Sequence, residues 1–149
     1  MFRFLPVAAL ALPALAQAGG PLQVVSQVLV GARSRAADGT TRVALVPARR
    51  VVPGDRVTFV LAYRNTGAQP VANVAFDNPV PAGLAYRAPA AGTPAPDVSV
   101  DGRTFAALPA LRVGARAATV DDVRHVRWRL DRPIPAGASG KLAFQAVLR

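Results

Sequence analysis

The stretch VVPGDRVTFVLAYRNTGAQPVANVAFDNPVPAGLAYR, residues 51–87, decides the fold of this chain. Turn-forming residues interrupt it at positions 53–55, 65–67, 78–79 and 81–83, where Pro, Gly, Asn and Asp favour reversal of the chain. Between the first two turns, large apolar residues alternate with smaller or polar ones, and the large ones are Val57, Phe59, Leu61 and Tyr63. This alternation predicts a β-strand with one buried face.

The turn residues are expected to hold the fold rather than a ligand. They are Pro53, Gly54, Asp55, Asn65, Gly67, Pro81 and Gly83. Pro53 and Gly54 turn the chain, and the Asp55 carboxylate accepts backbone N–H bonds inside that turn. Asn65 and Gly67 are predicted to adopt the left-handed conformation that a tight return needs.

The residues that precede this stretch predict a β-hairpin. Residues 22–30 (LQVVSQVLV) have high β-propensity and are expected to form a first strand at a sheet edge. Asp38-Gly39 is a hairpin signal, and residues 41–46 follow as the returning strand. We therefore assign residues 19–50 to an N-terminal hairpin within the sandwich and residues 51–149 to the main domain.

Two further strands end the chain. In residues 126–130 (VRWRL), Val126, Trp128 and Leu130 are expected to face the core, where Trp128 bridges two sheets. Residues 142–148 repeat the alternation. About eight or nine short strands separated by turns, with no amphipathic helix, predict an all-β, two-sheet antiparallel β-sandwich.

Three connecting segments carry weaker signals. Residues 88–96 (APAAGTPAP) contain three prolines and no large apolar side chain, which predicts an exposed, mobile connection. Asp101-Gly102 predicts a tight hairpin. Residues 119–122 are expected to form one helical turn capped by Thr119.

The N-terminus has the three parts of a secretory signal peptide. Residues 1–3 (MFR) supply a positive end, residues 4–15 an apolar run and residues 16–18 (AQA) a cleavage site, so residues 1–18 are expected to be removed after Ala18. The apolar run is shorter than the roughly 20 residues that span a bilayer. These features predict an exported protein, periplasmic or extracellular, with no membrane span after processing.

Composition excludes several classes of chemistry. The chain has no cysteine, which removes disulfides, thiolate catalysis and cysteine-ligated zinc, and its single histidine, His125, removes histidine-rich metal sites. Residues 97–102 match the first half of a calcium loop, but Leu108 stands where a bidentate acid is required, so a hairpin is the preferred interpretation. We expect no metal and no cofactor.

Catalytic side chains are sparse, since all eight acidic residues are aspartates. Residues 137–141 (GASGK) match neither a nucleophile elbow nor a phosphate loop and are predicted to form a turn. His125 and either Asp121 or Asp122 formally complete a catalytic triad with one of the serines, but no local motif supports it. The serines considered are Ser26, Ser34, Ser99 and Ser139. We expect a protein that is not an enzyme.

The formal net charge is +10, and almost all of the positive charge is arginine. Such a balance favours association with polyanions such as acidic glycan, anionic lipid or nucleic acid through counterion release. Because the arginines are scattered, an ordinary solvated surface is the alternative. The best candidate anion-binding face is the outward row His125, Arg127 and Arg129, which Lys141 joins if the last strand is adjacent.

Four motifs give the chain a specific resemblance. They are VPGDRVTFVLAYRNTG at residues 52–67, DNPVPAGLAY at 77–86, VRWRL at 126–130 and IPAGASGKLAF at 134–144. In this order they resemble the DUF11 family, the conserved-repeat immunoglobulin-like domains of bacterial envelope and surface proteins. The resemblance implies an immunoglobulin-like sandwich, usually repeated along long surface proteins and taken as a structural or spacer module. This chain differs in having one copy after a signal peptide, an extra N-terminal hairpin and a longer middle insertion.

Three functional hypotheses follow. The first is a non-enzymatic, exported immunoglobulin-like domain with a structural or interaction role in the bacterial envelope or extracellular space, whose partner is an unidentified protein or polyanion. The second is a polyanion-binding protein that uses the basic sheet face. The third is a subunit of an oligomer formed by strand exchange, in which residues 22–30 pair with the sheet edge of a neighbour.

Overall fold

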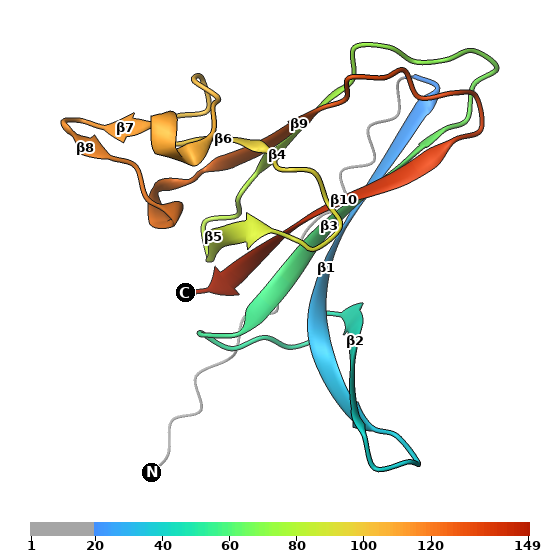
Figure 1. Ribbon diagram of the computed structural model, residues 1–149, viewed down its shortest axis with the longest axis vertical. Helices are drawn as coiled ribbons and strands as arrows, with labels where there is room; N and C mark the ends of the chain where they lie inside the picture. The colour runs from blue at the N-terminus through green and yellow to red at the C-terminus, as the bar shows by residue number, and fades with distance from the viewer. Residues whose placement is uncertain (1–19) are drawn as a thin grey trace, which may run out of the picture.

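The computed structural model describes residues 20–149, which form a two-layer antiparallel β-sandwich (Figure 1). The predicted leader, residues 1–18, and its cleavage after Ala18 lie outside the described residues. The larger sheet has the strand order β2-β1-β3-β10-β5, with β1 (Leu22–Arg35), β2 (Thr41–Pro47), β3 (Arg56–Asn65), β10 (Ser139–Leu148) and β5 (Leu84–Pro89). The smaller sheet has the order β4-β9-β6, with β4 (Ala75–Pro79), β9 (His125–Arg129) and β6 (Asp97–Ser99). The all-β, two-sheet prediction is confirmed.

Short elements fill the connection between β6 and β9. The ribbon of β7 (Arg112–Val113) and β8 (Arg116–Ala117) is flanked by the 3₁₀ helices η1 (Leu108–Ala110) and η2 (Val120–Asp122). The predicted helical turn at residues 119–122 is confirmed as η2. Thr119 Oγ1 donates a hydrogen bond to the Asp122 carboxylate at 3.0 Å, and the Asp122 N–H donates to the Thr119 carbonyl at 3.0 Å.

The core lies between the two sheets and follows the alternation of the sequence. Val57, Phe59 and Leu61 of β3 are buried, as predicted. Phe144 of β10 is completely buried, and its ring centroid lies 5.1 Å from that of Phe59 and 6.3 Å from that of Trp128 in the other sheet. The prediction that Trp128 is a core residue bridging the sheets is therefore confirmed.

Residues 88–96 include no buried residue, which agrees with the predicted exposure. The segment is not a loose connection, however, because Ala88 and Pro89 belong to β5 and hydrogen bonds hold the residues that follow. The Trp128 Nε1–H donates a hydrogen bond to the Pro94 carbonyl at 2.9 Å, and the Ala90 N–H donates to the Ala143 carbonyl at 2.9 Å. The prediction considered side chains alone. A segment without large side chains is still held in place when a buried indole needs its backbone carbonyl.

The turn predicted at residues 53–55 is confirmed. Gly54 has a φ of 95°, a conformation that favours glycine. The Asp55 carboxylate accepts the Val52 N–H at 2.9 Å, and the Asp55 N–H donates to the Val52 carbonyl at 3.0 Å.

The turns proposed after β4 are half right. The reversal at Pro81 and Gly83 is confirmed, because the Leu84 N–H donates to the Pro81 carbonyl at 2.8 Å. Asn78 and Pro79, by contrast, are the last residues of β4 and pair with β9. The turn proposed at residues 78–79 was wrong because a proline is tolerated at the end of a strand that has a free edge.

Asn65 and Gly67 stabilise the end of β3, but neither has a positive φ, so the predicted left-handed conformation was wrong. The chain makes no tight return there, because it crosses from β3 to β4 in the other sheet. Asn65 is fully buried, and its Nδ2 donates to the carbonyls of Gln69 at 2.8 Å and Ile134 at 2.9 Å. Its Oδ1 accepts the Gly67 N–H at 2.9 Å. Gly67 packs against Pro21, where a Cβ would come within 2.5 Å of the proline.

The predicted N-terminal hairpin is confirmed, and it extends beyond the sandwich (Figure 1). Residues 22–30 of β1 pair with β3, whereas residues 29–35 pair with β2. The predicted edge position of β1 therefore holds only for the residues that β2 does not cover. We call residues 29–47, where β1 and β2 pair with each other, the arm.

Candidate functional site

Two residues of the predicted basic row share one carboxylate. Asp77 of β4 lies opposite Arg127 of β9 in the register of the smaller sheet. Arg127 Nη2 donates to Asp77 Oδ2 at 2.7 Å, and His125 Nδ1 lies 3.3 Å from Asp77 Oδ1. The structure therefore brings His125 and Arg127 together around an acid that the sequence reasoning had not connected with them.

Arg127 is also covered from a second side. Its guanidinium carbon lies 3.4 Å from the ring centroid of Phe105, which belongs to the segment after β6. The Arg127 side chain is 23% exposed, and its Nε is buried without a hydrogen-bond partner. Because an ion pair and an aromatic ring already occupy this guanidinium, Arg127 stabilises the fold rather than offering a cation to a ligand.

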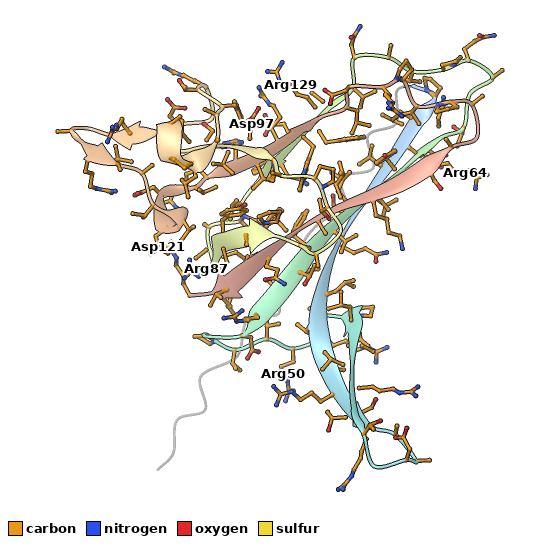
Figure 2. The ribbon with its side chains drawn as sticks, viewed as in Figure 1. Arg50, Arg64, Arg87, Asp97, Asp121 and Arg129 are labelled. Atoms are coloured by element: carbon orange, nitrogen blue, oxygen red, sulfur yellow. The ribbon has the colours of Figure 1, made fainter. Side chains whose placement is uncertain are left out.

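Arg129 and Lys141 are both exposed, but they lie in different sheets. Arg129 is on β9, whereas Lys141 is on β10, where it pairs with Ala62 of β3. The condition under which Lys141 was expected to join the row is not met. Figure 2 shows Arg129 with the smaller sheet and Arg64, a neighbour of Lys141 in the larger sheet, at the far end of the β3–β10 pair.

The formal triad is not assembled around His125. Its carboxylate partner is Asp77, while Asp121 accepts a hydrogen bond from Arg87 at 2.8 Å (Figure 2). Ser99 lies opposite His125 in the register of β6 and β9, but its Oγ donates to Asp101 at 3.0 Å and accepts the Gly102 N–H at 2.9 Å. These bonds hold a turn at residues 99–102. The predicted tight hairpin was wrong, because residues 103–105 form no strand and the chain returns to β6 only at the Val98–Ala106 bridge.

Charge reversal is expected to destabilise the fold at Arg127 but not at Arg129. Arg127→Glu places a second carboxylate against Asp77 and removes the contact with Phe105, so we expect the free energy of unfolding to fall by about 2 kcal/mol. Arg129→Glu is the matched control and should change it by less than about 0.5 kcal/mol. Urea unfolding of both variants checks the prediction, and equal losses would contradict it.

The outward face of the larger sheet carries an open groove of about 440 Å³. It crosses three neighbouring strands and is lined by Gln23, Val25, Ala62, Tyr63, Arg64, Ser139, Gly140 and Lys141. Arg64 and Lys141 make the groove basic, and Val25, 50% exposed, forms its wall at β1. Lys141 therefore belongs to a different surface from the one on which it was predicted.

The arm exposes most of its large apolar side chains. Val43 is 64% exposed and Leu45 is 54% exposed, and every residue of β2 is exposed. Val43 and Leu45 share a face of the ribbon with Leu29 of β1, as the register shows. Because a two-stranded ribbon has no core of its own, this face packs against nothing else in residues 20–149.

By the register, Arg33 lies opposite Val43 on the same face of the arm, whereas Arg42 lies on the other face. In all, five arginines lie on the arm or just after it. They are Arg33 and Arg35 on β1, Arg42 on β2, and Arg49 and Arg50 just after β2, with Arg50 at the base of the arm in Figure 2. The ion pairs found within residues 20–149 involve none of these five. The one acid of the arm, Asp38, is held in the turn by the Thr40 N–H at 3.0 Å and the Thr40 hydroxyl at 2.6 Å.

Sequence reasoning missed the arm as a surface. The composition and alternation in residues 22–30 and 41–46 predict the two strands of a hairpin, but they do not say which side chains of these strands remain exposed. A usable signal was present, because residues 22–50 contain five arginines and no aromatic residue. The strands that fill the core, in contrast, supply Phe59, Phe76, Trp128 and Phe144.

Three aspartate carboxylates accept hydrogen bonds from nearby groups, and these bonds lower their pKa values. The N–H groups of Thr104 and Arg103 lower the pKa of Asp101, and the Thr40 hydroxyl lowers that of Asp38. The Arg116 guanidinium, which donates to Asp122 at 2.7 Å, holds the pKa of that carboxyl far below 3.8.

Stability is therefore expected to decrease in acid. Because the folded-state pKa values of Asp38, Asp101 and Asp122 are lowered, their stabilisation is present in full above about pH 4 and is lost as pH falls through the folded values. Urea unfolding at pH about 7, 4 and 2.5 should show this decline. Asp122→Asn should flatten it, whereas Asp131→Asn is the control at an exposed position. An unchanged slope in Asp122→Asn would contradict the assignment.

Within residues 20–149, no three His, Cys, Asp or Glu side chains gather in a way that could hold a metal ion. No helix in that part of the chain is long and apolar enough to cross a membrane. Comparison of the chain with protein-family models, curated proteins and solved structures finds no match.

Proposed function

We propose that this chain is a non-enzymatic, exported β-sandwich of the immunoglobulin-like type, with an interaction role in the bacterial envelope or extracellular space. Its contact surface is the arm. The observation that carries the proposal is the apolar face of this ribbon, which leaves the sandwich with Val43 and Leu45 more than half exposed.

The chemistry of the arm supports a binding role. Single exposed apolar residues are common on protein surfaces, but apolar residues grouped on one face indicate a contact. Val43 and Leu45 are grouped in this way with Leu29, and Arg33, which lies opposite Val43 on the same face, adds a positive charge. A partner that covers these apolar residues and carries a negative charge opposite Arg33 matches both features.

Polyanion binding is the second candidate, and the five arginines of residues 33–50 favour it. They carry positive charge that is balanced by none of the ion pairs within residues 20–149. We assign the polyanion site to the arm and not to the row of His125, Arg127 and Arg129 on β9, because Arg127 is already paired with Asp77. Binding of this kind weakens steeply as salt rises.

Cosedimentation with isolated bacterial envelopes tests the proposal. Protein purified after export is mixed with envelopes at low and high salt, and N-terminal sequencing of the same preparation should give Gly19 as the first residue. Replacing Val43 and Leu45 by serine should reduce binding at least about tenfold. Val52→Ser is the control, since Val52 is 54% exposed outside the arm.

The arginines separate the two candidates. If the double variant Arg33→Gln/Arg42→Gln does not bind, and high salt also abolishes binding of the unmodified protein, the partner is a polyanion. If binding survives high salt and is lost only in the serine variant, the contact is apolar and the partner is a protein. Binding that neither pair of substitutions changes would exclude the arm.

A further inference from the structure

We propose that two copies of this chain pair through the free edge of β1 and form one continuous sheet across a two-fold axis. The contact lies outside the arm, so it is independent of the function proposed above. It specifies the residues and the register of a pairing that the sequence suggested only as a possibility for residues 22–30.

The free edge has definite ends. At one end, Pro21 has no N–H, and its carbonyl accepts the Thr66 N–H at 2.7 Å. At the other end, the Ala48 N–H donates to the Val28 carbonyl at 3.0 Å, and β2 covers the strand from Leu29 onwards. In the part of the chain that the structure describes, residues 22–27 therefore have β3 on one side and no strand on the other.

The hydrogen bond from Ala48 to Val28 shows which backbone groups of β1 point at the free edge. The Val28 carbonyl points away from β3, and in an antiparallel strand the N–H and C=O of every second residue point the same way. Leu22, Val24 and Ser26 therefore direct both of their backbone groups at the free edge. Gln23, Val25 and Gln27 direct theirs at β3.

This pattern is self-complementary. When two edges run antiparallel with Val24 opposite Val24 of the second copy, Leu22 lies opposite Ser26 of that copy, and the reverse pair is equivalent by symmetry. Each of the three residue pairs exchanges two bonds, so about six interchain hydrogen bonds form. A shift that places Val25 opposite itself is excluded, because Leu22 would then occupy the position of Ala48 of the second copy.

The proposed pairing brings a residue just before β1 in one copy close to the residue after β2 in the other. In the favoured register, Gly20 is the residue that approaches Ala48 of the second copy. Gly20 is exposed, and a Cβ built on it meets nothing within 4 Å. Because Gly20 precedes β1 and is a glycine, it can turn away from Ala48 of the second copy without moving the paired residues.

The edge lacks the features that prevent such pairing. Proteins protect edge strands with charge, proline or a bulge. Residues 22–28 (LQVVSQV) contain no charged residue and no proline, and their register with β3 is continuous.

Charge selects a second copy as the occupant. On a chain with a formal net charge of +10, a stretch without any charge is where two copies can approach with the least repulsion. An acidic strand would gain more from the arginines of the arm than from this edge. Pairing of two copies should therefore persist at high salt, unlike the binding of a polyanion.

Sedimentation velocity between about 10 and about 500 µM tests the pairing. We expect a monomer–dimer equilibrium that high salt leaves in place. Ser26→Pro should weaken the dimer at least about tenfold, because it removes an N–H that points at the second copy and is not used by β3. Val43→Pro is the matched control, since by the register with β1 its N–H faces the free edge of β2.

Hydrogen exchange gives a second, residue-specific measurement. As concentration rises, exchange should slow at the amides of Val24 and Ser26 but not at Gln23 and Val25, which β3 already protects. Val25→Lys, which changes an exposed side chain and no backbone group, should also weaken the dimer. A monomer at all concentrations overturns the proposal. So does a dimer that Val43→Pro abolishes and Ser26→Pro leaves intact, or edge protection that requires a different protein.

Discussion

Replacing Phe144 by alanine is expected to lower the free energy of unfolding by about 3–5 kcal/mol. The Phe144 side chain is completely buried between the sheets, with ring centroids 5.1 Å from Phe59, 5.8 Å from Tyr86 and 6.3 Å from Trp128. Alanine leaves a cavity lined by these three rings, and rigid aromatic rings collapse poorly into it. Because Trp128 is the only tryptophan, its fluorescence during urea unfolding reports directly on this part of the core.

Phe105→Ala is the matched control for this experiment. Phe105 is partly exposed and contacts Arg127 rather than the core between the sheets. Its loss should cost about 1 kcal/mol, which is the contribution expected from a cation–π contact at the surface. If the two alanine variants unfold at the same urea concentration, Phe144 does not have the central position in the core that the structure gives it.

Asn65→Asp is expected to reduce stability by about 3–5 kcal/mol at neutral pH, although the two side chains have almost the same shape. The amide nitrogen of Asn65 donates to the carbonyls of Gln69 and Ile134, and the residue is fully buried. A carboxylate in its place cannot donate and faces two carbonyl oxygens. It is also removed from water, which for an unpaired charge costs several kcal/mol.

The same variant should respond to pH in the opposite direction from the unmodified protein. Burial and the two carbonyls raise the folded-state pKa of the introduced carboxyl, so its destabilisation sets in as pH rises above the unfolded value of about 3.9. The difference in stability between the variant and the unmodified protein should therefore be smallest in acid. Asn73→Asp, at an exposed position with φ 54°, is the control. A deficit in Asn65→Asp that does not change with pH would mean that the loss is steric.

The strands of the sandwich could be predicted from the sequence because their burial is periodic. Val57, Phe59 and Leu61 alternate with less buried residues, and Trp128 has apolar neighbours two positions away on either side. Such a pattern is compatible with few structures other than a half-buried strand. The same reasoning placed the turns at residues 53–55 and 81–83 and the N-terminal hairpin.

Which strands share a sheet could not be predicted, because alternation within a strand does not say which strand lies beside it. Lys141 and Arg129 both face outwards, yet they lie in different sheets. The role of Asn65 was missed for a related reason. Its sequence position suggested a local turn, whereas one of its bonds reaches Ile134, 69 residues away.

The apolar face of the arm shows a third limit. Residues 41–46 have the composition of a buried strand, but burial depends on whether an opposing layer exists at that point of the sheet. Leu45 and Val43 lie opposite Gly31 and Arg33, on the face of β1 that also carries the exposed Val25, so they point away from the smaller sheet. Sequence periodicity therefore identifies a strand but does not show which of its faces is buried.

The length of β1 has a mechanical consequence. Its 14 residues join the arm to the sandwich without a hinge, and its first nine residues pair with β3. A pull on the arm along β1 therefore loads all of these antiparallel bonds in shear at once, instead of breaking them one after another as a peeling force would. Through this strand, the arm can transmit tension directly to the centre of the larger sheet.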